Sequence, residues 1–187
     1  MATTADIKVG VFIRFNGDLH MVEENQHRTP GNLRAFYQVK MRSVKTGKIT
    51  ETRFRSGEEI ELARVERKKY SYVYHDGQSY SFMDQQTYDQ IPVSEVVLGE
   101  GAKYLKEGEV VELMFDGANV VGADLPFNVN LKVVETVPGV KGDTATGAQK
   151  PAKVETGAMV NVPLFINEGD VIKVDVRTGQ YLERVKQ

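Results

Sequence analysis

Apolar and polar residues alternate along most of the chain. Near the N-terminus Val11, Ile13 and Phe15 alternate with Phe12, Arg14 and Asn16. Three further runs are rich in β-branched residues: 110–115, 130–134 and 170–176. A period of two places one face of a strand on a core and the other in water. The pattern therefore predicts β-strands, with only residues 100–106 resembling a short helix.

Turn dipeptides separate these runs and predict tight hairpins. Asn16-Gly17, Asp76-Gly77 and Asp116-Gly117 are pairs in which Asn, Asp or Gly adopts a positive φ at low cost. Hairpins then recur about every 10 residues, which is typical of small barrels or sandwiches. The fold class predicted is all-β.

The chain of 187 residues is long for one barrel of such short strands. A charged stretch at 63–69 separates two strand-rich regions, and a second seam lies near 126–128. We expect domains at 1–64, 65–128 and 129–187. Each has about 60 residues, the size at which a small domain can just form its own core. The prediction is three small β-barrels in tandem.

Composition excludes several kinds of chemistry. The chain has no Cys and only three His, so a disulfide framework, a thiolate zinc site and a cysteine nucleophile are ruled out. The closely spaced carboxylates at 58–61 and 107–109 are expected to be solvated. We expect no catalytic residue, no metal and no cofactor. The N-terminus lacks a signal-peptide pattern and no apolar run spans a bilayer, so a cytoplasmic protein without membrane association is expected.

The net charge of −2 conceals a strong asymmetry. Residues 1–64 hold 11 basic and 8 acidic side chains, whereas residues 65–128 hold 5 basic and 11 acidic ones. Residues 129–187 hold 8 basic and 7 acidic side chains. Within 28–55, eight basic residues accompany a single acid, Glu51. Such a block suits a phosphate backbone, although a solvated strand face explains it equally well.

Residues 27–36 predict the tip of a hairpin. Pro30-Gly31 is a strong turn signal because Pro fixes φ and Gly takes the positive-φ position. Strands are expected on both sides, at 19–24 and 35–43. The tip would present Asn32, Leu33 and Arg34. By itself this segment is compatible with an ordinary surface hairpin or with a probe that enters an RNA cavity.

Two other features have alternative interpretations. The tyrosines of the central region either pack one face of a sheet, which we favour, or stack on bases: Tyr70, Tyr72, Tyr74 and Tyr80. The Gly- and Thr-rich run 138–149 is either a linker or a nucleic-acid-contacting loop of an OB-like barrel.

The strongest motif lies in the last third of the chain. Residues 150–169 fit the pattern Lys-x-Ala-x4-Gly-x2-Val-x-Val-Pro-x2-Ile-x2-Gly at every fixed position. Together with 138–144, 171–185, Pro30-Gly31 and Ala35-Phe36, this motif resembles the bacterial elongation factor P family over essentially the whole chain. The resemblance implies a KOW/SH3-like N-terminal barrel followed by two OB-fold barrels.

The resemblance also implies a function. Family members bind the ribosome between the peptidyl and exit sites, beside the peptidyl-tRNA, and relieve stalling at consecutive prolines. They position the CCA end of the tRNA and supply no covalent chemistry. The implied partners are both ribosomal subunits, peptidyl-tRNA, ribosomal RNA and mRNA in the exit site. A monomer is expected.

Site residues carry over position by position. The tip loop maps to Pro30, Gly31, Asn32, Leu33 and Arg34, and the exit-site codon loop maps to Gly142, Asp143 and Thr144. The tRNA contacts near the C-terminus map to Tyr181 and Arg184. The residues expected on RNA phosphates are Arg28, Lys40, Arg42, Lys45, Lys48, Arg53 and Arg55.

One position departs from the family pattern. Many members carry a post-translationally modified Lys or Arg directly after Pro-Gly, whereas this chain has Asn32. The tip either works unmodified, with Arg34 as its cation, or carries an unfamiliar modification. We favour the unmodified tip. The close elongation factor P-like paralogue, a general RNA-binding module and an enzyme with an unrecognised site are the other hypotheses.

Overall fold

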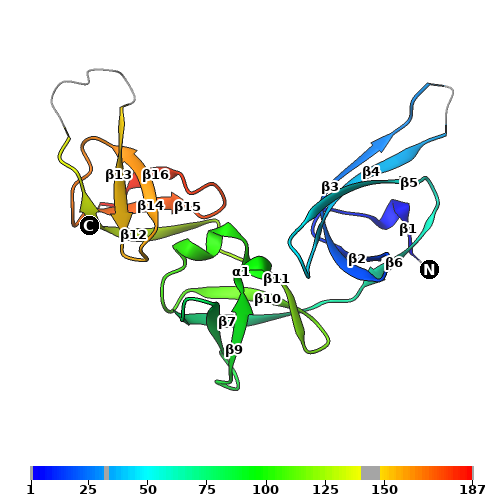
Figure 1. The fold of residues 1–187 in the computed structure, drawn as a ribbon, viewed down its shortest axis with the longest axis horizontal. Coiled ribbons are helices and arrows are strands. Elements are labelled where there is room, and N and C mark those ends of the chain that lie inside the picture. Colours follow the sequence, from blue (N-terminus) through cyan, green and yellow to red (C-terminus); the bar gives the residue numbers. More distant parts are fainter. Residues whose placement is uncertain (1, 32–33, 140–147, 187) are drawn as a thin grey trace. The chain divides into compact units, whose positions relative to one another are not determined.

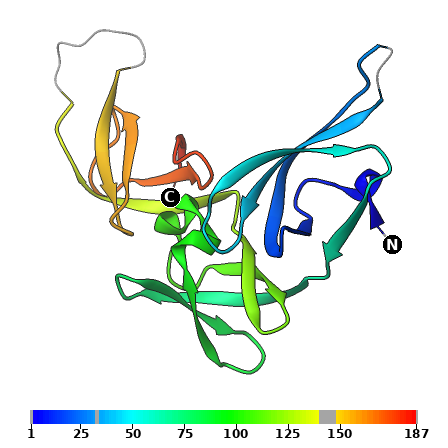
Figure 2. The ribbon, with the colours of Figure 1, turned by 45° about the vertical axis from the view of Figure 1, so that its right-hand side comes forward.

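The structure is a computed structural model that describes residues 2–31, 34–139 and 148–186. Its strands form three sheets, so the all-β prediction is confirmed (Figure 1). Each sheet is curled, as a second view shows (Figure 2). In the described part of the chain, no helix is long and apolar enough to cross a membrane.

The N-terminal sheet is antiparallel and has the order β1-β6-β2-β3-β4-β5. Its strands are β1 (Ala2–Thr3), β2 (Phe12–Phe15), β3 (Asp18–Arg28), β4 (Phe36–Ser43), β5 (Ile49–Arg55) and β6 (Glu59–Ala63), and the 3-10 helix η1 (Thr4–Asp6) follows β1. Ile13, Val22, Val39 and Met41 are fully buried on its inner face. The turn between β2 and β3 contains Asn16-Gly17 with positive φ at both residues, as predicted.

The central sheet has the order β11-β10-β7-β8-β9. Its strands are β7 (Glu66–His75), β8 (Ser79–Asp84), β9 (Gln90–Ser94), β10 (Val110–Asp116) and β11 (Asn119–Asp124). The predicted helix at 100–106 is the 3-10 helix η2 (Glu100–Tyr104), and a short helix that was not expected, α1 (Glu95–Leu98), precedes it. Ser94 starts α1 because its hydroxyl accepts a hydrogen bond from the Val96 backbone N–H.

The C-terminal sheet is antiparallel and has the order β14-β13-β12-β15-β16. Its strands are β12 (Asn128–Thr136), β13 (Gln149–Val154), β14 (Met159–Pro163), β15 (Val171–Asp175) and β16 (Tyr181–Arg184). Leu131, Val133, Ile166 and Ile172 are completely buried in its core. Tyr104 of η2 also packs into this core.

The chain divides into two compact units. One comprises residues 1–68 and 113–123, and the other comprises residues 69–112 and 124–187. The three-domain division proposed from the sequence stays a prediction. Residues 113–123 of the β10–β11 hairpin belong to the first unit, where they pack on the outer face of the N-terminal sheet.

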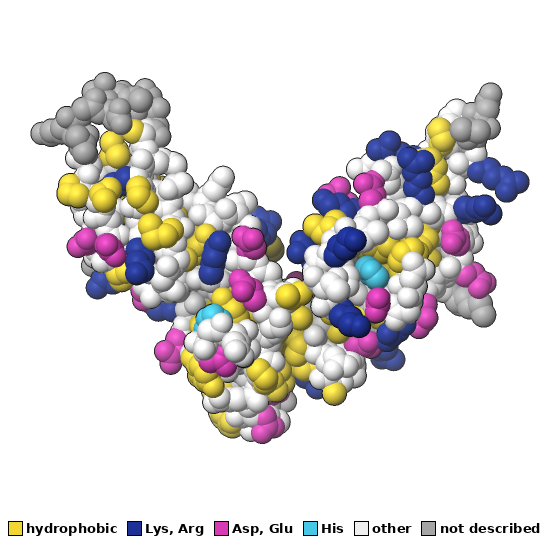
Figure 3. Space-filling model, in the orientation of Figure 1, with side chains coloured by type: hydrophobic (Ala, Val, Ile, Leu, Met, Phe, Trp, Pro, Cys, Tyr) yellow, Lys and Arg dark blue, Asp and Glu magenta, His cyan; other side chains and the backbone are white. Residues whose placement is uncertain are grey.

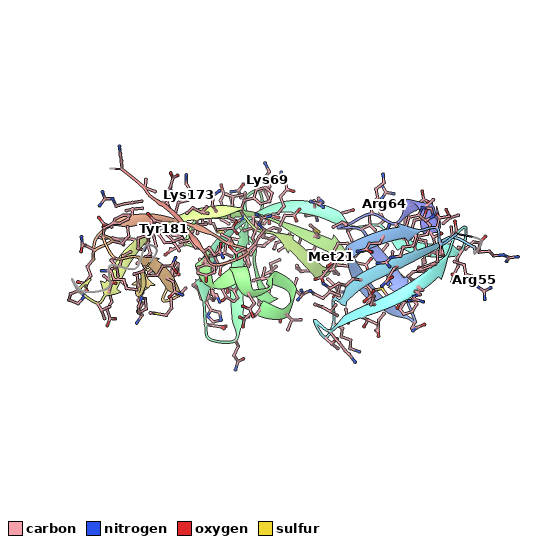
Figure 4. The ribbon with its side chains drawn as sticks, turned by 90° about the horizontal axis from the view of Figure 1, so that it is seen from above. Met21, Arg55, Arg64, Lys69, Lys173 and Tyr181 are labelled. Atoms are coloured by element: carbon pink, nitrogen blue, oxygen red, sulfur yellow. The ribbon has the colours of Figure 1, made fainter. Side chains whose placement is uncertain are left out.

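Phe12 shows why that outer face is buried. The alternation predicted that Phe12 faces water, but its side chain is only 1% exposed and contacts Met114 and Val121. Gly122 permits this approach, since a Cβ there would lie 3.0 Å from the Phe12 ring. Met21 lies where the hairpin meets the sheet (Figure 4). A second element therefore covers a face that a single strand pattern assigns to solvent.

Candidate nucleic-acid interface

The β3–β4 hairpin extends beyond the core of its sheet. Its last pairs are Asn25 with Val39, Gln26 with Gln38, His27 with Tyr37 and Arg28 with Phe36. Val39 is the last fully buried residue, so the outer end of the hairpin lacks a core beneath it. β5 pairs with β4 as far as Phe36, so three strands reach this outer end of the sheet. The sequence predicted this hairpin, but β3 reaches Arg28 instead of ending at Glu24.

Backbone pairing and aromatic contacts hold this outer part. The His27 and Tyr37 rings stack with centroids 4.6 Å apart. Near its base, the Asn25 amide donates a 2.7 Å hydrogen bond to the Ile7 carbonyl. Residues 25–28 of β3 are held by these contacts and not by alternating apolar side chains. The sequence pattern therefore predicted that the strand ends at Glu24, four residues too early.

The tip follows directly on the strands. Gly31 has a φ of +33°, as the turn prediction required. Asn32 and Leu33 lie outside the described residues. Arg34 is exposed, and no carboxylate of the described residues pairs with it.

Strand register gathers the predicted phosphate-binding cations on the outward face of β4 and β5. Phe36 lies opposite Arg55, and Gln38 lies opposite Arg53. Lys40 and Arg42 continue the same face of β4 toward the turn into β5. Basic side chains flank the hairpin (Figure 3), and Arg55 extends from the end of the sheet (Figure 4).

Two of these cations already have carboxylate partners. Lys40 Nζ lies 2.8 Å from Glu24 Oε1, and Arg42 Nε lies 2.6 Å from Glu23 Oε1. The hydrogen bond to Glu24 raises the pKa of Lys40. The charge count over 28–55 missed both acids because they come from β3, outside that range. A register shift between Val22 and Glu24 brings the two consecutive glutamates to this face.

The other predicted cations lack ion pairs within the described residues. Arg53 lies over the Phe36 ring at 5.2 Å, and Arg28 donates a 2.8 Å hydrogen bond to Gln26. Lys45 and Lys48 are exposed in the turn between β4 and β5. The outward face of β3, β4 and β5, called the hairpin face below, therefore has cations without ion pairs at its outer end and in the turn between β4 and β5. Between these two groups, Lys40 and Arg42 are neutralised by glutamates.

The C-terminal residues predicted to contact tRNA lie on β16. Tyr181 is half-buried against the core of the C-terminal sheet. Arg184 lies over the Phe165 ring at 5.7 Å, and its Nη1 is 3.9 Å from Asp170 Oδ2. Both side chains are therefore held by their own domain before any partner binds. Gly142, Asp143 and Thr144 lie outside the described residues.

A buried lysine links the end of β12 to the start of β13, on either side of these three residues. Lys150 is 4% exposed, and its Nζ donates a 2.8 Å hydrogen bond to the Val137 carbonyl. The Thr136 hydroxyl donates to the Pro151 carbonyl at 2.9 Å. From the sequence, Lys150 was only the first residue of the motif at 150–169. Its burial was not predicted, because no local pattern marks a lysine that points into the core of a sheet.

The central tyrosines pack largely as the favoured interpretation predicted. Tyr70 and Tyr80 are buried, and Tyr72 is half-buried beside Tyr80 and Phe82. Desolvation raises the pKa of all three phenols. Tyr74 differs because a register shift after Tyr72 leaves it half-exposed.

The described residues contain no candidate metal site. Among residues 2–31, 34–139 and 148–186, no group of three His, Asp or Glu side chains is arranged to hold a metal ion.

Known families match each third of the chain. Residues 3–60 match the elongation factor P KOW-like domain, residues 65–123 match the elongation factor P OB domain, and residues 129–184 match the elongation factor P C-terminal domain. The chain belongs to the elongation factor P family. The family contains translation elongation factors, so the general function predicted from the sequence is confirmed at that level.

Individual relatives agree with this family assignment. The elongation factor P of Chloroflexus aggregans is 52% identical over 185 residues, which cover 98% of both chains. That of Chloroherpeton thalassium is 50% identical over 189 residues and covers both chains completely. A solved structure of eukaryotic translation initiation factor 5A from Methanococcus jannaschii has a TM-score of 0.50 at 20% identity, covering 67% of this chain and 90% of that one. This last likeness concerns the fold alone.

Proposed function

We propose that this elongation factor P family member binds the ribosome between the peptidyl and exit sites. There it lies beside the peptidyl-tRNA and promotes peptide-bond formation at stalled consecutive prolines. It acts by positioning the tRNA CCA end, since ordering the reactants lowers a barrier without a chemical group from the protein. The ribosome makes the bond, and the protein is not itself an enzyme.

The observation that carries this proposal is the β3–β4 hairpin. It extends beyond the buried core and ends in a turn followed by the exposed Arg34. A hairpin tip with no buried core beneath it suits entry into an RNA cavity, and a cation at the tip suits phosphate groups near a tRNA terminus. We assign the tip contact to Pro30, Gly31, Asn32, Leu33 and Arg34, with Arg34 as the functional cation and Asn32 unmodified.

The remaining contacts follow from charge and position. Arg28, Lys45, Lys48, Arg53 and Arg55 contact tRNA or ribosomal RNA phosphates. Lys40 and Arg42 contact phosphates only after their ion pairs with Glu24 and Glu23 have broken. Tyr181 and Arg184 approach the tRNA, and Gly142-Asp143-Thr144 approaches mRNA in the exit site. The protein acts as a cytoplasmic monomer.

A reporter assay tests the proposal. Translation of a consecutive-proline reporter and a proline-poor reporter is compared in a system that lacks the endogenous factor. Arg34→Ala should lower rescue of the proline reporter and leave the other unchanged. Lys8→Ala removes an exposed charge away from the hairpin tip and is the matched control.

Two results separate the alternatives. Equal loss of both reporters with Arg34→Ala refutes the positioning mechanism. An equal effect of Arg34→Ala and Lys45→Ala favours the general RNA-binding module, which needs no special tip. Mass analysis of the peptide spanning residues 28–40 from native protein should give the unmodified mass, and an increment there would contradict an unmodified Asn32.

A further inference from the structure

A pocket of about 490 Å³ opens on the C-terminal sheet. It is lined by Gln149, Met159, Asn161, Thr178, Gly179, Gln180 and Tyr181. We propose that this pocket binds one unpaired nucleobase of single-stranded RNA. The inference rests on the proposed function because Tyr181, a proposed tRNA contact, forms part of the wall.

The first wall is the outward face of the β13–β14 hairpin. Pro151 lies opposite Asn161, and Lys153 lies opposite Met159. The intervening residues Val160 and Val162 are buried in the core. Strand register therefore fixes Gln149, Met159 and Asn161 on the solvent side, and Met159 is 57% exposed.

The second wall is the turn between β15 and β16. Gly179 N–H donates to the Asp175 carbonyl at 2.8 Å, and Asp175 N–H donates to the Gln180 carbonyl at 2.9 Å. The Asp175 carboxylate accepts hydrogen bonds from the backbone N–H groups of Arg177 and Thr178. These bonds fix the turn in one conformation.

Tyr104 supports the same turn from beneath. Gly179 has a φ of +69°, and a Cβ at this position would collide with the Tyr104 hydroxyl. Tyr104 is buried in the core of the C-terminal sheet. Both walls are thus formed before a ligand arrives, which lowers the entropic cost of binding.

The lining favours a base over a phosphate. It contains three carboxamides, a hydroxyl, a phenol and a thioether, and no charged side chain. Carboxamides present a donor and an acceptor side by side, which matches the edges of bases. Tyr181 and Met159 provide aromatic and apolar surface for a base face. The volume is in the range of small-ligand sites and is too small for a duplex.

A nuclear magnetic resonance titration tests binding with the full-length, isotope-labelled protein. AMP, CMP, GMP and UMP are added separately, with inorganic phosphate as the control ligand. At least one nucleotide should shift the side-chain amide signals of Gln149, Asn161 and Gln180, whereas phosphate should not. Absence of such shifts with all four nucleotides, or equal shifts with phosphate, overturns the proposal.

Paired variants locate the binding. Asn161→Ala should raise the Kd of the bound nucleotide about fivefold or more, because a paired base edge loses its partner. Asn130→Ala removes an exposed amide from β12 outside the pocket and should leave the Kd unchanged. Equal Kd values for the two variants overturn the assignment to this pocket.

Photo-crosslinking on the ribosome identifies the source of the base. Met159→p-benzoylphenylalanine places the reactive group in the pocket, and adducts are analysed for tRNA and for mRNA. An adduct with either RNA supports the proposal and names the source, whereas adducts with protein only overturn its use on the ribosome. Loss of nucleotide binding in Asn161→Ala, with the Arg34 reporter result unaffected, separates this pocket from the proposed function of the tip.

Discussion

Salt dependence should distinguish the unpaired cations of β5 from the paired cations of β4. The double variant Arg53→Ala/Arg55→Ala removes two guanidinium groups that have no carboxylate partner among the described residues. The double variant Lys40→Ala/Arg42→Ala removes the same formal charge from groups bound to glutamates. A paired cation must give up its glutamate to reach a phosphate, so it releases fewer RNA counterions.

The expected magnitude follows from the number of phosphates contacted. Each neutralised phosphate contributes about 0.7–0.9 to the slope of log affinity against log salt concentration. Removing Arg53 and Arg55 should therefore reduce the slope by about 1.4–1.8. Over a fourfold rise in salt, the wild type then loses about 7–12 times more affinity than this variant. Removing Lys40 and Arg42 should leave the slope nearly unchanged.

The assay is equilibrium binding to ribosomes that carry peptidyl-tRNA, measured by fluorescence anisotropy between 50 and 200 mM salt, a range of about fourfold. Thermal unfolding of both variants provides the control, since exposed ion pairs contribute only about 0–1 kcal/mol to stability. Equal reductions in slope for the two variants would refute the argument that Glu23 and Glu24 withdraw their partners from RNA.

Three further substitutions test packing and pH dependence. Phe12→Ala should lower the free energy of unfolding by about 3–5 kcal/mol in urea denaturation, because it empties the contact with Met114; a change below about 1 kcal/mol would show that the hairpin is not anchored there. Lys150→Ala should lower it by about 2–4 kcal/mol by leaving the Val137 carbonyl unpaired, and an unchanged midpoint would contradict this role. Hydrogen bonding to Arg177 lowers the pKa of Asp175, so its stabilisation is complete above the unfolded pKa of about 3.9 and is lost as pH falls through the folded pKa. Asp175→Asn should therefore melt below the wild type at neutral pH, with a difference that shrinks in acid; a difference independent of pH would refute the linkage.

The fold was largely predictable because its signals are local. Two-residue alternation marked buried strand positions such as Ile13, and Asn16-Gly17 supplied the positive-φ turn that joins β2 to β3. The burial of Phe12 could not be predicted from local alternation. Its burial depends on Met114 and Val121, which are distant in sequence and belong to a different sheet. Local patterns cannot show which solvent face another element will cover.

The candidate interface was predictable in composition but not in its charge balance. Counting residues along 28–55 lists the cations of the candidate face, yet a sheet places acidic neighbours from other strands beside them. A register shift at Glu23, which has no local sequence signature, brings Glu23 and Glu24 next to Arg42 and Lys40. The proposed nucleobase pocket has no sequence signature for a related reason: its walls come from two separate hairpins and contain no charged side chain, the feature by which a sequence indicates RNA contacts.

Charge compensation gives the hairpin face two separate positive ends. Arg28 and Arg55 flank Phe36 at the outer end, whereas Lys45 and Lys48 lie in the turn beyond Ser43. At about 3.3 Å per residue, the extended chain places these ends roughly 25–30 Å apart. That distance exceeds the Debye length of about 8 Å at physiological salt, so the two ends act on RNA independently. In the proposed function, the cations nearest Arg34 would therefore contact the RNA around the tip, while Lys45 and Lys48 would contact a different stretch of RNA backbone.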